Sequence, residues 1–338
     1  MRIVVLDGFT LDQGDAEVWR GLESLGEVRV HARTRPEERA ERCRGAAIVL
    51  TNKVAVDAAL MDATPGLKYI GVLATGTNIV DLEAARARGI VVTNVPGYST
   101  DSVAQLVFAL ILHFTHDVAG HARDVQAGRW AASEDFCFLR QPLVELKGKT
   151  LVVVGSGAIG SAVTRIALAF GMQTIAAQVP GSPSSPASIT SPSAPSMTQP
   201  SLQKTRTPLE AALPQADFVT LHCPLTEATR GLVDAKFLAL LKPGAILINT
   251  GRGPLLSQDD LIRSLAFGRL GGVGLDVLAQ EPPPADHPLL DPKAPWARKV
   301  VVTPHLGWAT VEARRRLLEK VLTNLRAFLD GKDLNRVA

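Results

Sequence analysis

The run Gly155-Ser-Gly-Ala-Ile-Gly160 constrains the fold most, because both of its flanks fit one supersecondary unit. The preceding stretch, Thr150–Val154, is apolar and β-branched, which predicts a buried parallel strand. The following stretch, Ser161–Phe170, has the apolar spacing of a helix. The three glycines would permit a tight turn, a close ligand approach at the helix N-terminus and close packing of helix on strand. In this context the run indicates a dinucleotide-binding βαβ unit, whereas alone it would indicate only a turn and a helix cap.

The end of the next predicted strand bears on which dinucleotide is bound. An acidic residue about 20 positions after the glycine run normally binds the adenosine ribose hydroxyls. Here the stretch Met172–Gln178 ends in an amide, which can hydrogen-bond a ribose without repelling a 2′-phosphate. No arginine follows immediately to bind such a phosphate. The sequence therefore favours NAD(H) and leaves NADP(H) open.

Three chemically complementary side chains follow later strands. Arg252 comes after the apolar stretch 245–248 between two glycines, and its planar guanidinium suits a carboxylate. His305 comes after the stretch 300–304, and its imidazole can exchange a proton near neutral pH. Glu281, ahead of a proline run, is placed to hydrogen-bond the far imidazole nitrogen and fix its tautomer. Each residue alone could be a surface or core residue; together, at successive strand ends, they indicate a catalytic site.

The chain resembles the D-isomer-specific 2-hydroxyacid dehydrogenase family, and within it the glycerate dehydrogenase/hydroxypyruvate reductase branch. The resemblance extends over nearly the whole chain. It rests on seven segments in order: Gly71–Asn78, Asn94–Gln105, Gly155–Gly160, Leu221–Leu225, Asn249–Gly253, Asp276–Pro282 and Pro304–Ala309. The departures are Gln178 in place of the acid and the insert described below.

The resemblance implies a fold, an activity and site residues. The fold is α/β, with two Rossmann-like or flavodoxin-like lobes, parallel sheets and an interdomain cleft. The activity is reduction of a small 2-oxo acid, hydroxypyruvate or glyoxylate, to D-glycerate or glycolate. Arg252 would hold the substrate, His305 would be the acid/base and Glu281 its partner. The substrate carboxylate would be bound by the loop Leu73, Ala74, Thr75 and Gly76. The cofactor would be bound by Val103, Gly155, Gly157, Ala158, Ile159, Gly160, Gln178, Cys223, Pro224, Thr250, Gly251, Asp276 and Gly307.

Two other functions stay open. One is a phosphoglycerate dehydrogenase without its usual regulatory extension, since the chain ends soon after its last predicted helix. The other is a non-catalytic, NAD-sensing binding protein of the corepressor type, which would share the fold. The complete triad of Arg252, Glu281 and His305 favours an enzyme.

Composition excludes several classes of protein. The chain has 338 residues, with 36 basic and 33 acidic side chains and a net charge of +3, too balanced to predict nucleic-acid or membrane binding. The N-terminus reads as a strand rather than a signal peptide, so a cytoplasmic protein is expected. Cys43, Cys137 and Cys223 lie outside metal-ligand spacings, which predicts reduced thiols and no metal site.

The order of predicted elements gives two domains. A substrate domain is expected at residues 1–98 plus 309–338 and a dinucleotide-binding domain at 99–308. Strands are predicted at 3–6, 46–50, 69–72 and 90–93. One long helix, Asp101–Gln126, is apolar all round its first half, and we expect it to form a homodimer interface. The family resemblance implies that the helix at 309–330 returns to the first domain, and its residues Arg314, Arg315 and Arg316 are expected on a solvated face.

Residues 180–201 form a segment of different composition. Of these 22 residues, 14 are Pro or Ser and none is charged. Such a stretch lacks the apolar content to order itself. A flexible surface insertion is therefore expected here, in preference to a regulatory element.

Overall fold

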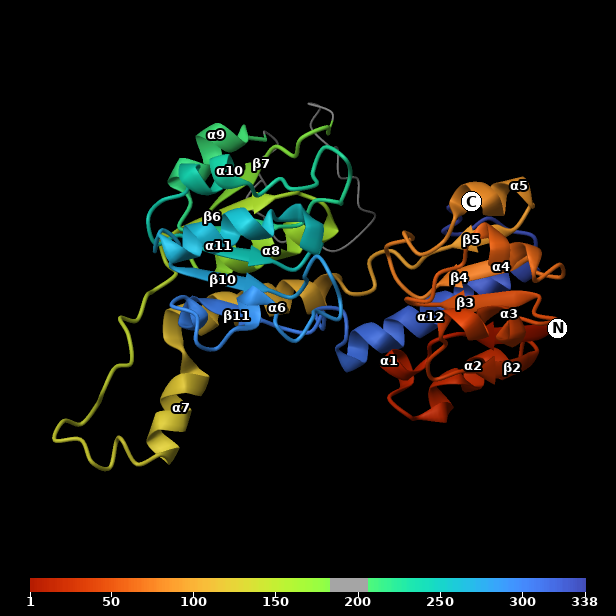
Figure 1. Ribbon diagram of the computed structural model, residues 1–338, viewed down its shortest axis with the longest axis horizontal. Coiled ribbons are helices and arrows are strands. Elements are labelled where there is room, and N and C mark those ends of the chain that lie inside the picture. Colours follow the sequence, from red (N-terminus) through yellow and green to blue (C-terminus); the bar gives the residue numbers. More distant parts are fainter. Residues whose placement is uncertain (183–205) are drawn as a thin grey trace. The chain divides into compact units, whose positions relative to one another are not determined.

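The computed structural model describes residues 1–182 and 206–338, which form two compact units. Unit 1 comprises Met1–Ser99 with Trp308–Ala338, and unit 2 comprises Thr100–Gly307 (Figure 1). These boundaries differ by one residue from the sequence-based division. The predicted insert at 180–201 lies outside the described residues from position 183 onward.

Unit 1 contains a five-stranded parallel sheet in the order β2-β1-β3-β4-β5. The strands are β1 (Arg2–Val5), β2 (Glu27–Val30), β3 (Ile48–Thr51), β4 (Tyr69–Val72) and β5 (Val91–Thr93). The helices are α1 (Phe9–Asp12), α2 (Arg20–Glu23), α3 (Arg39–Arg42), α4 (Ala58–Asp62), α5 (Leu82–Ala87) and α12 (Val311–Leu329). The edge strand β2 was not predicted, because its sequence Glu-Val-Arg-Val is largely exposed and lacks an apolar run.

Both faces of this sheet are covered, which explains its continuous apolar strands. Along β1, Val4 packs into one core with α4 and α5, whereas Ile3 and Val5 pack into the other with α12. Successive side chains of a strand point to opposite faces, so a strand buried on both faces must be apolar throughout. The α/β class with parallel sheets is thus confirmed for this unit.

Unit 2 contains a six-stranded parallel sheet in the order β11-β10-β9-β8-β6-β7. The strands are β6 (Thr150–Val154), β7 (Gln173–Ala177), β8 (Phe218–Leu221), β9 (Ile246–Asn249), β10 (Gly272–Leu275) and β11 (Val300–Val302). The helices are α6 (Thr100–His116), α7 (Val118–Gln126), α8 (Ala158–Ala169), α9 (Leu209–Ala212), α10 (Ala235–Leu240) and α11 (Gln258–Ala266). Helices α6 and α8 cover one face, and α9, α10 and α11 cover the other.

The prediction of one helix over Asp101–Gln126 is wrong. The segment forms α6 and α7, which meet at a bend of 54°. Asp117 lies at the break with φ of 42°, a left-handed conformation that ends α6, and its carboxylate accepts the Gly120 N–H as the N-cap of α7. Within residues 1–182 and 206–338 no single helix is long and apolar enough to cross a membrane. Helices α6 and α7 reach that length and apolarity only when they are taken together across their bend.

The C-terminal segment is anchored to unit 1. Helix α12 contributes Leu317, Val321 and Leu325 to the core, as expected from its amphipathic pattern. The expectation of a solvated arginine face is wrong at two positions. Arg314 donates a hydrogen bond to the Leu11 carbonyl at 2.9 Å and Arg316 donates one to the Tyr98 carbonyl at 2.9 Å, so these two arginines fasten α12 to its unit.

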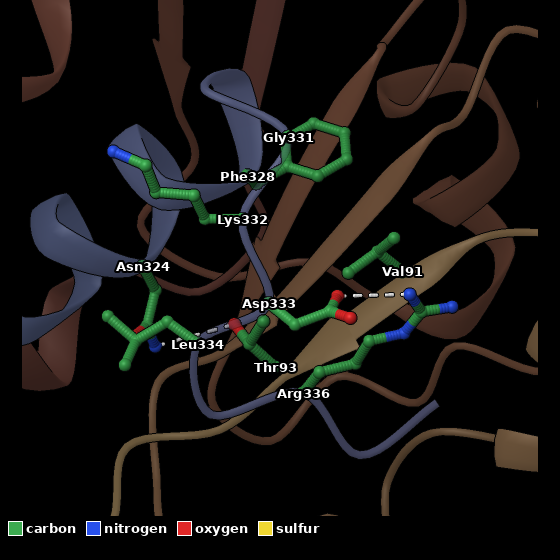
Figure 2. Close-up of a pocket in the computed structure, with 9 residues that line it drawn as sticks. All are labelled: Val91, Thr93, Asn324, Phe328, Gly331, Lys332, Asp333, Leu334 and Arg336. Atoms are coloured by element: carbon green, nitrogen blue, oxygen red, sulfur yellow. Dashed lines mark hydrogen bonds and ion pairs between the residues drawn. The ribbon is translucent and has the colours of Figure 1, made fainter.

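A small pocket lies where the chain end meets β5 and α12 (Figure 2). Its volume is about 160 Å³. Asn324 approaches the Thr93 hydroxyl at 3.5 Å, and Asp333 pairs with Arg336 at 3.1 Å. The Val92 N–H donates to the Ala338 carbonyl at 3.1 Å. The Val92–Ala338 hydrogen bond attaches the tail to the sheet, and none of the predicted site residues lines the pocket.

Candidate active site

The triad residues all lie in unit 2, on loops that leave one edge of its sheet. Strands β9, β10 and β11 are parallel neighbours, so their carboxyl ends meet at the same edge. Arg252 follows β9, and His305 follows β11. Glu281 lies in the loop after β10, the strand between them. The topology therefore gathers residues that are far apart in sequence.

The loop that carries Arg252 is held by the last residue of β9. The Asn249 side chain donates to the Arg252 carbonyl at 2.9 Å and accepts from the Gly251 N–H at 3.0 Å. A Cβ on Gly253 would lie 2.0 Å from the Leu278 carbonyl, so only glycine lets this loop pack on the next one. One guanidinium N–H of Arg252 donates to the Gly251 carbonyl at 2.9 Å. The half-buried arginine is thus oriented by its own loop.

Glu281 joins its own loop to the imidazole. One carboxylate oxygen, Oε1, accepts the Leu278 N–H at 3.0 Å, and the other, Oε2, lies 2.6 Å from Nδ1 of His305. Both side chains are about one-third exposed, Glu281 at 32% and His305 at 27%. A carboxylate on Nδ1 assigns that nitrogen its proton and leaves Nε2 on the opposite side of the ring for a reactant. The hydrogen bond is the one anticipated between these residues.

Asp276 fixes the backbone around the imidazole. It accepts hydrogen bonds from the Thr303 hydroxyl at 2.6 Å, the Leu306 N–H at 2.9 Å and the Gly307 N–H at 2.8 Å. Burial raises the pKa of the Asp276 carboxyl, while these donors oppose that shift. His305 lies within this clamp at φ of 52°, a left-handed conformation that is uncommon for a non-glycine residue. The buried carboxylate supports that conformation from both sides.

Gly307 also contacts helix α6. Its carbonyl accepts the Ser102 hydroxyl at 2.5 Å, and a Cβ on it would lie 3.5 Å from the Val103 side chain. Val103 is itself buried. The segment after His305 is therefore held between Asp276 and α6.

The glycine loop has the shape that a dinucleotide requires. Gly155 has φ of 103°, and a Cβ there would lie 2.6 Å from the His222 backbone. Gly157 is the N-cap of α8, makes no side-chain cap hydrogen bond and has no atom within 4 Å of a Cβ position. Ala158 and Ile159 begin the helix. The N-terminus of α8 is therefore open on the side of Gly157, which suits the approach of a pyrophosphate.

Other predicted cofactor residues lie at neighbouring strand ends. Gln178 follows β7, and Cys223-Pro224 follows β8. Burial raises the pKa of the Cys223 thiol to about 11, which keeps it protonated near neutral pH. The Thr250 hydroxyl is buried and has no partner among the described residues. That unsatisfied polar group beside Gly251 is consistent with a bound polar ligand.

The predicted substrate loop belongs to unit 1 and follows β4. Leu73 is buried, and its N–H donates to the Thr51 carbonyl at 2.8 Å. The Thr75 hydroxyl donates to the Val95 carbonyl at 2.9 Å. Ala74 and Gly76 flank this threonine. The loop is thus fixed within its own unit.

Sequence reasoning assigned no role to Asn249 or Thr303, although both position the triad loops. Asn249 could have been found from its place immediately before a Thr-Gly-Arg-Gly loop, where a short amide commonly hydrogen-bonds the backbone. The role of Thr303 depends on a partner 27 positions away in sequence, and no local signal reveals it.

Comparison with known proteins decides the family. The model for the NAD binding domain of D-isomer specific 2-hydroxyacid dehydrogenases matches residues 108–307. A hydroxypyruvate reductase from Blautia hydrogenotrophica is 39% identical over 100% of this chain and 99% of its own. The chain belongs to the D-isomer-specific 2-hydroxyacid dehydrogenase family. This confirms the resemblance that the motifs indicated.

Two further proteins are similar to this chain. A glycerate dehydrogenase from Methylorubrum extorquens is 37% identical over 89% of this chain and 88% of its own. The crystal structure of the TT0316 protein from Thermus thermophilus is 37% identical, covers 100% of both chains and has a TM-score of 0.82. The family is one of oxidoreductases, and its nucleotide-binding model covers the glycine loop and the whole triad.

Proposed function

We propose that this dehydrogenase reduces hydroxypyruvate or glyoxylate with a nicotinamide cofactor, giving D-glycerate or glycolate. The observation that carries the proposal is the Glu281–His305 hydrogen bond of 2.6 Å on the loops beside Arg252. The names of the similar hydroxypyruvate reductase and glycerate dehydrogenase support this choice of substrate.

The chain's own residues would bind the substrate and move its proton. When bound, the reduced nicotinamide supplies a hydride to the substrate's carbonyl carbon. As the imidazolium, His305 would donate the Nε2 proton to the carbonyl oxygen, and Glu281 would stabilise that cation through its hydrogen bond with Nδ1. Arg252 would orient the 2-oxo acid and stabilise the developing alkoxide. The backbone of the loop Leu73–Gly76 would bind the substrate carboxylate.

The cofactor residues fit a dinucleotide. The glycine loop and the uncapped N-terminus of α8 would receive the pyrophosphate, and Thr250, Gly251 and Asp276 would line the nicotinamide end. Gln178 would hydrogen-bond the adenosine ribose. An amide there accepts NADH and repels no 2′-phosphate, so Gln178 itself discriminates little.

The proposed reaction is tested by initial rates of NADH and NADPH oxidation with hydroxypyruvate, glyoxylate, pyruvate and phosphohydroxypyruvate. We expect kcat/KM to be highest for hydroxypyruvate or glyoxylate. A clear preference for phosphohydroxypyruvate would identify a phosphoglycerate dehydrogenase instead. Cofactor binding without turnover of any of these acids would identify a nucleotide-sensing protein of the corepressor type.

We also propose a homodimer formed through α6, α7 and the segment 127–145. Figure 1 shows α7 and this segment extending away from the sheet of unit 2. Large apolar side chains are exposed along it, among them Trp130 at 51%, Phe136 at 89% and Leu139 at 58%. An ion-pair network of Arg140 with Asp117 and Asp124 holds the segment to α7. An ordered arm with an exposed apolar surface is suited to a second copy of the chain.

If α7 and the segment 127–145 form a dimer interface, a charge introduced there should dissociate the dimer, whereas a charge introduced elsewhere should not. Phe136→Asp should convert a dimer into a monomer in size-exclusion chromatography with light scattering, because a carboxylate would be desolvated at the interface. Phe267→Asp is the matched control, since Phe267 is 86% exposed at the end of α11 and outside the arm. A wild-type monomer, or equal dissociation by both substitutions, would contradict the proposal.

A further inference from the structure

The end of β7 lies beside the glycine loop. Strand β7 pairs in parallel with β6, and Ala177 is the partner of Val154. Gln178 and Gly155 therefore leave adjacent strand ends. In this fold the adenosine ribose lies at the end of the second strand, so its 2′ position faces the residues around Gln178.

The chain returns to this strand end at Arg206. Thr207 forms a parallel bridge with Ala177, the Thr207 N–H donates to the Ala176 carbonyl at 2.9 Å, and the Gln178 N–H donates to the Thr207 carbonyl at 2.8 Å. β7 is the last strand of its sheet, with β6 on its inner side. Arg206-Thr207 thus runs along the outer side of β7, next to the end that carries Gln178.

The pairing register places the arginine on the same face as Gln178. Thr207 is paired with Ala177 across the bridge. Arg206 comes one residue before Thr207 in its own segment, and Gln178 comes one residue after Ala177 in the other. Side chains alternate along extended backbone, and residues one step before and one step after a pair share a face.

The guanidinium of Arg206 approaches the loop that follows Gln178. Arg206 Nη1 lies 3.5 Å from the Ser182 hydroxyl, which itself donates to the Val179 carbonyl at 2.6 Å. Within residues 1–182 and 206–338, Arg206 makes no ion pair with a carboxylate. Among the described residues, most N–H groups of this half-buried guanidinium have no hydrogen-bond acceptor, so a ligand at this strand end could bind them.

We propose that Arg206 binds the adenosine 2′-phosphate of NADP(H) and makes the chain prefer NADPH to NADH. The inference rests on the proposed function, since it assigns one contact of the same cofactor. A guanidinium matches a phosphate with paired, charge-assisted hydrogen bonds. The neutral Gln178 adds no repulsion, whereas an acid there would favour NADH. The local sequence after Gln178 lacks this arginine, and only the strand pairing supplies it.

The test compares dissociation constants of NADPH and NADH, measured by fluorescence titration without substrate. For Arg206→Gln we expect NADPH to bind about tenfold more weakly, as for the loss of a charge-assisted contact, and NADH to change by less than about twofold. Arg165→Gln is the matched control: Arg165 is an exposed arginine on α8 of the same unit, and its loss should change neither constant. Added salt should weaken NADPH binding more in the wild type than in Arg206→Gln.

The outcomes separate this inference from the proposed function. Tighter binding of NADPH by the wild type, lost selectively in Arg206→Gln and regained in part by Arg206→Lys, supports the assignment. If the wild type binds NADH at least as tightly as NADPH, or if Arg206→Gln weakens both equally at an unchanged melting temperature, the assignment of Arg206 is overturned while the proposed reaction stands. If neither dinucleotide binds the wild type, both are overturned.

Discussion

Replacing His305 with alanine should lower kcat for hydroxypyruvate reduction by about a hundredfold or more, the usual contribution of a general acid. The structure supports this size of effect because both the imidazole ring and the backbone that carries it are held in place. Glu281 lies 2.6 Å from its Nδ1, and its backbone is held by the Asp276 clamp. Dissociation constants for NADH and NADPH should change by less than about threefold, since the glycine loop lies on other strands. A kcat close to the wild-type value would contradict the role of His305.

Glu281→Gln provides a graded comparison with that variant. Glutamine has one acceptor oxygen where Glu281 uses two, so it can accept either the Nδ1 proton or the Leu278 N–H but not both, and it also removes the negative charge beside the imidazole. We therefore expect kcat to fall by about tenfold, less than for His305→Ala. The double variant should be no slower than His305→Ala alone, because Glu281 acts through the imidazole. Additive losses in the double variant would show that Glu281 has a separate role.

The second large effect concerns two glycines three positions apart. A Cβ on Gly160 would lie 2.0 Å from the Gly155 carbonyl oxygen, and backbone must move to admit it. Gly160→Ala should therefore lower the free energy of unfolding of unit 2 by about 3 kcal/mol, the upper range for overpacking. Gly157→Ala meets no atom within 4 Å and should change that free energy by less than about 1 kcal/mol.

The variants Gly160→Ala and Gly157→Ala also distinguish an effect on helix packing from an effect on cofactor binding. The open space at Gly157 is where the pyrophosphate would approach the N-terminus of α8, so Gly157→Ala should weaken both dinucleotides by about tenfold or more at an unchanged melting temperature. Chemical denaturation and fluorescence titration measure the two effects independently. Equal stability of the two variants would contradict the close packing at Gly160. Unchanged cofactor affinity in Gly157→Ala would contradict the position of the pyrophosphate.

The sequence alone predicted the elements whose signals are local. The strand Thr150–Val154 was predicted with its observed bounds, because apolar residues continue along a strand that is buried on both faces. The family followed from seven ordered motifs. The edge strand β2 and the break at Asp117 were not predicted. An exposed edge carries little apolar signal, and one residue in a left-handed conformation ends a helix without any change in the surrounding apolar pattern.

What the sequence by itself determined was therefore the set of candidate reacting groups, Arg252, Glu281 and His305, and the glycine loop of the same unit. Tertiary structure decided which other groups surround them. The Asp276 carboxylate accepts hydrogen bonds from the loop that carries His305, and strand pairing brings Arg206 to the end of β7. The physical reason is that strand order places side by side segments that are distant in sequence. A hydrogen-bond partner or a cation supplied in this way leaves no periodicity or spacing to read.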